Sequence, residues 1–406
     1  MTLETPLQRS LYGSPLLRRN GKLALIVGLV ALFLYALPAF QRYYLTRPLV
    51  MLVGILAALV IYCPTLLALH FFDRREREPA WLFWGTIASV IFYFGPVTSR
   101  TLGIVRQTTG LSEWQFVGFV EEFWKVAPLL LLLIFARPAV NGVRDGLIYG
   151  ALGGLGFAAL ESGAYFSLQY FPQEGWAGIW SNLWGRATLL GTDNHVLFSA
   201  TLGAAIGYGI STRHRWLRYL VPIAGYLLVA LTHGQQDYIV GKALNVMGVL
   251  IGSALIQFLI GFPDLAALEG TPWQYVALLF GATVGLLGIN LLNIPILFWS
   301  LWQSGETERR VIRNQLASES ASVITPEEYA GVAAEKRFQL RVLPGYPKPI
   351  SRAIVQRQNE LAFRKSYVQR QGGDVESDRP IFLLRDAIAQ LRHKSPGINS
   401  AQESIL

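Results

Sequence analysis

The chain has 406 residues, of which 52% are hydrophobic and only 15% are charged. Soluble domains contain about 25% charged residues, and here the apolar residues are gathered in long runs over the first three quarters of the chain, which excludes an ordinary soluble protein. The formal net charge is +9, but Lys and Arg form no single stripe, which argues against nucleic-acid binding. Cys63 is the only cysteine, so no disulfide can form within the chain.

Nine apolar runs are candidates for membrane-spanning helices, since a hydrocarbon core about 30 Å thick requires about 20 apolar residues. The runs are residues 22–40, 48–72, 80–97, 114–136, 145–171, 187–210, 217–240, 243–262 and 273–302. No alternating segments typical of a membrane β-barrel occur. We therefore predict an all-α, polytopic transmembrane bundle. The last run is too long for one straight span and contains Pro295, which leaves eight or nine crossings open.

The sequence divides into a basic N-terminal segment (1–21), a transmembrane domain (22–303) and a C-terminal tail (304–406). The first apolar run is followed by further spans, so we do not expect a removable signal peptide. Basic residues precede the first run and recur in the loops 73–78, 137–144 and 213–218. These loops fall on the same side as the N-terminus if every earlier span crosses, and basic loops are typically cytoplasmic, so we expect a cytoplasmic N-terminus. We expect a plasma-membrane location, and the side of the membrane that holds the tail is left open.

The tail contains two clear helix signals. Thr325, Pro326 and Glu328 form a helix start with a capping box. Residues 380–394 have Leu384 and Ile388 on one face of a short amphipathic helix. The tail is expected either to form helices docked on the membrane domain or a partner, or to be a partly disordered appendage.

Ionisable residues within the apolar runs are costly in a bilayer and therefore mark candidate functional positions. The fourth run contains Glu121, Glu122 and Lys125. Lys125 is spaced to neutralise one carboxylate on the same helix, which leaves the other in need of a partner or a proton. Such a carboxylate suits a general base.

The fifth run carries Glu161 and, one turn later, Tyr165, which could orient it. Glycines before Glu161 permit close helix packing. Asp145 stands at the start of this helix, where a capping role suffices.

Histidines occur in the next two runs. His195 follows Asp193, a candidate helix cap, and His233 shares a helix face with Asp237. Their convergence with Glu121, Glu122 and Glu161 in one bundle would suit water activation, proton transport or metal binding.

In these blocks the sequence resembles the PrsW-type intramembrane proteases and, more distantly, the CAAX-processing protease superfamily. The resemblance covers roughly residues 50–260. It rests on an acidic loop ending in Glu78-Pro79, on Glu121-Glu122-Phe123-Trp124-Lys125, on the segment 145–165, and on His195 and His233. The chain departs from the family pattern at Ser162 and Asp237, where Asn is usual.

The resemblance implies hydrolysis of a membrane-anchored protein, such as an anti-sigma factor, within or beside the bilayer. Glu121 or Glu122, aided by His195, would activate water, and His233 with Asp237 would stabilise the oxyanion. Glu161 would be a second acid, with Lys125 and Tyr165 in support. If a metal such as zinc is used, its ligands would come from Glu122, Glu161, His195 and His233.

Two other functions remain open at this stage. The same acids could form the proton relay of a transporter or channel, although no inverted repeat is evident. The departures at Ser162 and Asp237 also allow an inactive scaffold relative. Other protease types are disfavoured, since the chain has neither a His-Glu-x-x-His helix nor a Gly-x-Ser-x-Gly elbow.

Overall fold

The computed structural model describes residues 19–75, 79–184, 186, 188–261, 271–335 and 341–393. Within these ranges the chain is helical and contains no β-strand, which confirms the predicted all-α class. The basic residues before residue 19, and residues 76–78 of the loop 73–78, lie outside the described residues.

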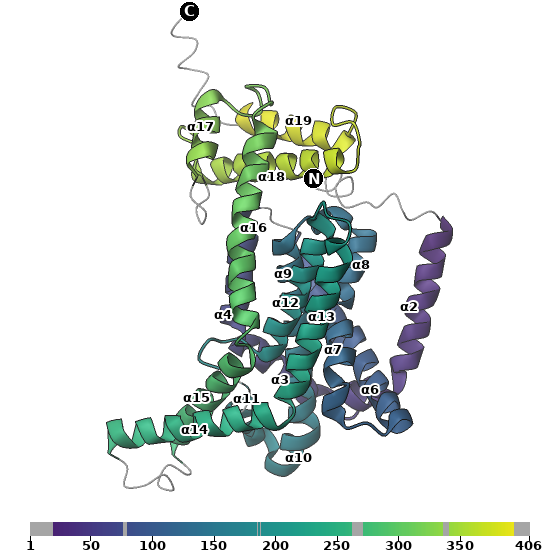
Figure 1. Cartoon of the computed structure of the whole chain (residues 1–406), viewed down its shortest axis with the longest axis vertical. Helices are drawn as coiled ribbons and strands as arrows, with labels where there is room; N and C mark the ends of the chain where they lie inside the picture. The colour runs from purple at the N-terminus through teal and green to yellow at the C-terminus, as the bar shows by residue number, and fades with distance from the viewer. Residues whose placement is uncertain are drawn as a thin grey trace, which may run out of the picture.

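The helices of the membrane domain surround a buried central helix, α9 (Figure 1). Their bounds are α2 (Arg19–Phe40), α3 (Pro48–Ile61), α4 (Cys63–Phe72), α5 (Ala80–Ser89), α6 (Gly95–Thr109), α7 (Val117–Lys125), α8 (Ala127–Phe135), α9 (Val143–Tyr165), α10 (Phe171–Glu174), α11 (Gly178–Trp184), α12 (Asn194–Ser211), α13 (Leu217–Gln236), α14 (Ile239–Ile260), α15 (Pro272–Ile289) and α16 (Asn293–Leu316). The longest candidate membrane span runs from Val143 to Trp184, and 89% of its most apolar part is buried. The chain is therefore a multi-pass membrane protein with α9 at its core.

Six of the described helical segments are long and apolar enough to cross a membrane, or seven if the bent pair α3 and α4 counts as one span. This count is lower than the eight or nine crossings expected from the sequence. The number of spans is lower because charged residues or helix breaks interrupt some of the predicted apolar runs. The run 114–136 forms two short helices, α7 and α8, and the first of them carries Glu121, Glu122 and Lys125.

Three of the predicted apolar runs are divided by a break that precedes a proline. The α3–α4 break is at Tyr62, before Pro64; the α7–α8 break is at Val126, before Pro128; and the α15–α16 break precedes Pro295. Proline has no N–H to donate to the preceding turn and crowds the backbone behind it, so the helix ends just before it. The last run is thereby divided, as its length and Pro295 suggested.

The tail helices form a second core that caps one end of the membrane domain (Figure 1). They are α17 (Pro326–Ala334), α18 (Lys348–Arg370) and α19 (Arg379–His393). Thr325 caps α17 with the reciprocal capping box that the sequence predicted. Leu384 and Ile388 of α19 are fully buried in this core. The expected boundary at residue 304 lies inside α16, which runs without a break from the membrane domain into the tail.

The tail docks on the loop that follows α4. The Arg75 side chain is 2% exposed and donates to the backbone oxygen of Gly305 at 3.1 Å. It also lies 3.6 Å from a carboxylate oxygen of Glu308 and 3.7 Å from one of Glu335. Asn359 of α18 donates to the Arg75 carbonyl at 2.9 Å. The tail therefore lies on the same side of the bundle as the loop at Arg75.

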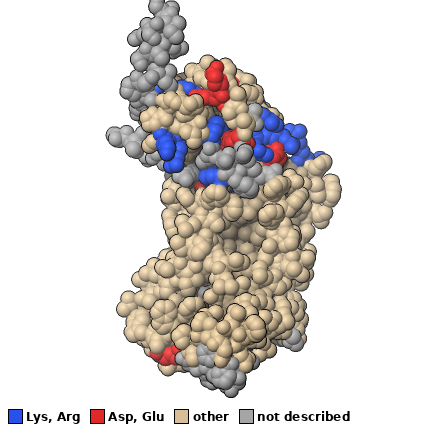
Figure 2. All heavy atoms as spheres, turned by 90° about the vertical axis from the view of Figure 1, so that its left-hand side faces the viewer, with Lys and Arg blue, Asp and Glu red and all other residues tan. Residues whose placement is uncertain are grey.

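The charged residues in view gather at the tail end, whereas the body of the membrane domain presents few of them (Figure 2). A surface almost free of Lys, Arg, Asp and Glu is what a hydrocarbon environment requires. On this face the charge distribution is that expected for a lower body embedded in the membrane with the charged tail at one end.

Candidate active site

Three ionisable side chains lie on the last two turns of α7. Glu121 is 6% exposed, and Glu122 and Lys125 are fully buried. Lys125 Nζ donates to Glu122 Oε1 at 2.8 Å and lies 2.9 Å from Glu121 Oε2. The lysine thus contacts both carboxylates, rather than the one expected from the sequence. A single positive charge faces two acids, so the cluster has room for a further cation or proton.

His195, in the first turn of α12, is held at both ring nitrogens. Lys125 Nζ lies 2.7 Å from Nδ1, and Glu161 Oε2 of α9 lies 2.8 Å from Nε2. An ammonium group can only donate, so Nδ1 is unprotonated and Nε2–H donates to Glu161. Asp193 caps α12 by accepting from the His195 backbone N–H at 2.8 Å, as predicted. The cap and the two ring contacts fix the orientation of the imidazole.

His233, near the end of α13, is 1% exposed. Its Nδ1 lies 2.9 Å from Glu122 Oε1, and because a carboxylate accepts, Nδ1 carries the proton. The Nε2 lone pair then lies 3.6 Å from Glu121 Oε2 and 3.9 Å from Asp237 Oδ2. Glu121 Oε2 is buried, and its charged partner is the Lys125 ammonium at 2.9 Å. The facing His233 Nε2 and Glu121 Oε2 are both electron-pair donors, so a water molecule or a cation would be attracted to both.

Glu161 has a second partner that the sequence interpretation missed. Arg186, on the segment between α11 and α12, places Nη2 2.8 Å from Glu161 Oε2. Its guanidinium lies 4.7 Å from the centre of the Tyr165 ring. Tyr165 was expected to orient Glu161, and it contacts the arginine that pairs with Glu161. A single Arg in a short connecting segment has no spacing pattern that would have indicated this role.

Two further polar contacts support the site from neighbouring helices. Ser199 Oγ of α12 donates to Glu122 Oε2 at 2.9 Å. Asn290, at the α15–α16 break, donates to Asn194 Oδ1 at 2.6 Å and accepts from Asn293 at 3.1 Å. Asn290 and Asn293 are fully buried. Two asparagines within the apolar run 273–302 are a signal that the sequence offers for a buried polar contact. Nothing in the sequence indicated that the partner is Asn194.

Glycines allow the helices to approach closely enough to form these contacts. A Cβ added at Gly154 of α9 would lie 2.2 Å from the His195 carbonyl oxygen, and one at Gly153 would lie 2.1 Å from that of Lys125. On α7, a Cβ at Gly118 would lie 2.0 Å from the Ala230 carbonyl oxygen of α13. These distances are far below contact between real atoms, so each crossing requires glycine. The close packing expected around α9 is therefore present.

Glu121, His195 and His233 could together hold a metal ion. Each offers one ligand atom, and these atoms lie within 4.8 Å of one another. Two imidazoles and one carboxylate form the donor set of several catalytic zinc sites. Glu161, on the other nitrogen of His195, is the kind of carboxylate that orients metal-bound histidines. The donor types therefore fit a divalent metal, which would take the place of the Lys125 ammonium beside His195 Nδ1 and Glu121 Oε2.

This donor set differs from the one expected from the sequence, which included Glu122 and Glu161. The Glu122 oxygens are occupied by Lys125, His233 and Ser199. Glu161 pairs with Arg186 and His195. Both acids thus have more partners than Glu121, whose Oε2 pairs with Lys125 at 2.9 Å.

A polytopic bundle that buries carboxylates, imidazoles and a lysine together is typical of membrane enzymes that activate water and of proteins that move protons. Residues 79–267 match the model of a family described as PrsW family intramembrane metalloprotease. This segment is a little under half of the chain and contains Glu121, Glu161, His195 and His233. The segment is thus similar to PrsW-type intramembrane metalloproteases, and the chain that carries it is an integral membrane protein. No curated protein and no solved structure matches the chain.

Proposed function

We propose that the protein cleaves single-span, membrane-anchored proteins at a peptide bond brought to Glu121, with water as the nucleophile. The observation that carries the proposal is the buried Glu121 Oε2, which lies 2.9 Å from the Lys125 ammonium and 3.6 Å from the unprotonated Nε2 of His233. Both atoms accept hydrogen bonds, and a water molecule between them could donate to both.

The reaction requires one proton to be removed from water and returned to the leaving amine. Glu121 accepts the proton as the water oxygen attacks the carbonyl carbon, and His233 Nε2 holds the other water hydrogen. Lys125 Nζ, 2.9 Å from Glu121 Oε2, is the nearest positive charge to the oxyanion that develops. Glu121 then protonates the amine nitrogen as the C–N bond breaks, which restores the site.

The remaining side chains position this machinery. Glu122 fixes the tautomer of His233, and Glu161 fixes that of His195. A divalent metal such as zinc, held by Glu121, His195 and His233, would polarise the peptide carbonyl and lower the pKa of the attacking water, and Glu121 would then act as a ligand in place of the base. Asp237, 3.9 Å from His233 Nε2, lies at the partly exposed edge of the site, where the substrate would enter.

The test is cleavage of a single-span substrate by the full-length protein in liposomes, with and without a metal chelator. We expect cleavage by the wild type and its loss in His233→Gln, with Glu113→Gln, an exposed acid on the short helix before α7, as the control. Loss of cleavage with the chelator and its recovery on adding zinc would assign the metal. Equal cleavage by wild type and His233→Gln would contradict the proposed site.

A further inference from the structure

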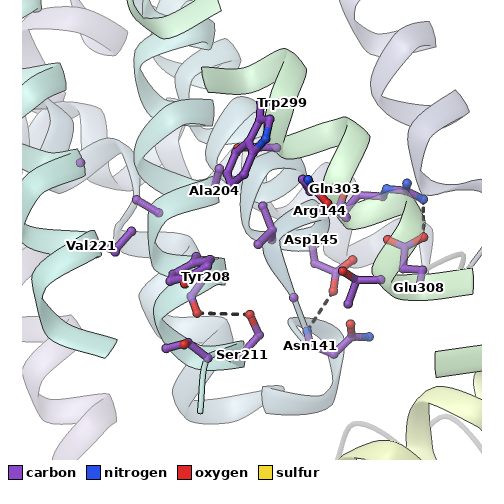
Figure 3. Close-up of a pocket in the computed structure, with 18 of the residues that line it drawn as sticks. Asn141, Arg144, Asp145, Ala204, Tyr208, Ser211, Val221, Trp299, Gln303 and Glu308 are labelled. Carbon is purple, nitrogen blue, oxygen red and sulfur yellow. Dashed lines mark hydrogen bonds and ion pairs between the residues drawn. The ribbon is translucent and has the colours of Figure 1, made fainter. Parts of the chain in front are cut away.

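A cavity of about 860 Å³ lies between α12, α13 and α16, close to the tail (Figure 3). It is separate from the active site. Thr201 of α12 lines the cavity, whereas Ser199, two residues earlier, points the other way and bonds Glu122. Two residues rotate a helix by about 200°, so the cavity and the active site lie on opposite faces of α12.

The walls of the cavity are apolar and open toward the bilayer. Ala204 and Val221 face its interior, and Trp299 of α16 stands at its edge (Figure 3). Leu220 and Trp299, on the two helices that flank the opening, are 50% and 58% exposed. Volumes of about 300–1,000 Å³ are typical of sites that enclose one small molecule. The cavity thus has the size and polarity for hydrocarbon chains.

The end of the cavity nearest the tail is charged, with two basic and two acidic side chains. Asp145 accepts from the Asn141 N–H at 2.9 Å, and Arg370 of α18 donates to the Asn141 carbonyl at 3.5 Å. The acidic Asp145 and the basic Arg370 therefore contact the two backbone polar groups of the same residue, Asn141. Beside them, Arg144 forms an ion pair with Glu308, and its buried Nε has no hydrogen bond. The cavity end thus presents closely spaced charges of both signs at the level where the membrane domain meets the tail.

We propose that the cavity binds one phospholipid with a phosphoethanolamine headgroup from the leaflet on the tail side. Its acyl chains lie between α13 and α16, its phosphate pairs with Arg370, and its ammonium donates to Asp145. A phosphoglycerol headgroup has no cation for Asp145, and a phosphocholine has no N–H to donate to it. The inference is independent of catalysis, because none of these residues belongs to the active site.

The test is native mass spectrometry of the full-length protein in detergent. The protein is incubated with equal amounts of phosphatidylethanolamine, phosphatidylcholine and phosphatidylglycerol that share the same acyl chains. We expect one retained phosphatidylethanolamine, preferred about tenfold, the scale of one charge-assisted hydrogen bond. Asp145→Asn should remove the preference, and Arg370→Gln should weaken retention of all three lipids, since each carries the phosphate. Arg379→Gln, an exposed arginine outside the cavity, should leave both retention and preference unchanged.

A matched pair tests the place of binding. Ala224 is exposed and lines the cavity, whereas the adjacent Ile223, 55% exposed, is not among its lining residues. Ala224→Trp should fill the space and abolish lipid retention, and Ile223→Trp should leave it unchanged. Equal retention of the three lipids, or retention by Ala224→Trp, would overturn the proposal. So would a photo-crosslinker at position 224 that captures a single-span peptide instead of lipid, since the cavity would then be a substrate groove.

Discussion

The Lys125 ammonium lies 2.7 Å from Nδ1 of His195, although 70 residues separate them in the chain. Lys125 Nζ also donates to Glu122 Oε1 at 2.8 Å. Lys125 therefore joins α7 to α12 at the point where the candidate catalytic groups meet. Its charge also stabilises a carboxylate that is fully buried and could not remain ionised alone.

Replacing Lys125 with methionine should destabilise the protein and abolish cleavage. The substitution leaves Glu122 without its cation in a buried position, which costs about 3–5 kcal/mol. The double variant Lys125→Met with Glu122→Gln should lose less stability than the sum of the single variants, because the unpaired charge is gone. Chemical unfolding in detergent measures both effects, and strict additivity would contradict a direct Lys125–Glu122 interaction.

Gly154→Ala should lower both stability and activity. Its Cβ would lie 2.2 Å from the His195 carbonyl oxygen, so α9 and α12 must separate, at a cost of about 1–3 kcal/mol. Gly85 is the control, because a Cβ there meets no atom within 4 Å. Gly85→Ala should be neutral or stabilising by about 0.5–1 kcal/mol, as in an unobstructed helix. Similar behaviour of the two variants, in thermal unfolding and cleavage assays, would show that the close crossing is not required.

Asn290→Leu should reduce kcat with little change in KM. The substitution leaves Asn194 Oδ1 and the Asn293 amide without their partner, at a cost of about 1–3 kcal/mol, and loosens the helix start that holds His195. Leu291→Ala, at the adjacent 72% exposed position, is the control. Steady-state cleavage kinetics distinguish the variants. An unchanged kcat in Asn290→Leu would show that α15 and α16 do not support the site.

Acid should loosen the tail through Glu319. Burial alone would raise the Glu319 pKa, but hydrogen bonds from Arg385 and Lys365 hold it below its usual value. A lowered folded-state pKa stabilises the fold above the ordinary pKa of about 4.3, and this contribution is lost as the pH falls through the folded value. Hydrogen exchange of α18 and α19 in the full chain should therefore accelerate below about pH 4. Glu319→Gln should show faster exchange at neutral pH and a weaker acid dependence, and an unchanged acid profile in this variant would contradict the assignment.

The sequence predicted those features that depend on local patterns. The capping box at Thr325 and Glu328 is present, and the helix expected at 380–394 occupies Arg379–His393. The ionisable residues of the apolar runs also converge, because a membrane interior leaves such groups few places other than a shared polar centre.

Other features depend on tertiary contacts that no local spacing records. Arg186 reaches Glu161 from a connecting segment, and Asn290 reaches Asn194 from a helix outside the matched family segment. The choice between Glu121 and Glu122 likewise depends on their surroundings. Only the structure shows that the Glu122 oxygens are bonded by α12 and α13, whereas Glu121 Oε2 pairs with Lys125 and faces His233 Nε2.

The most direct measurement compares Glu121→Gln with Glu122→Gln in the liposome cleavage assay, alongside their unfolding in detergent. The two substitutions are chemically identical and adjacent on α7, so any difference reflects the two environments. We predict that Glu121→Gln folds normally and loses cleavage by about 10²–10⁴-fold, the scale of a lost general base, whereas Glu122→Gln is measurably less stable. Full cleavage by a well-folded Glu121→Gln protein would contradict the role of Glu121 as the group that activates water.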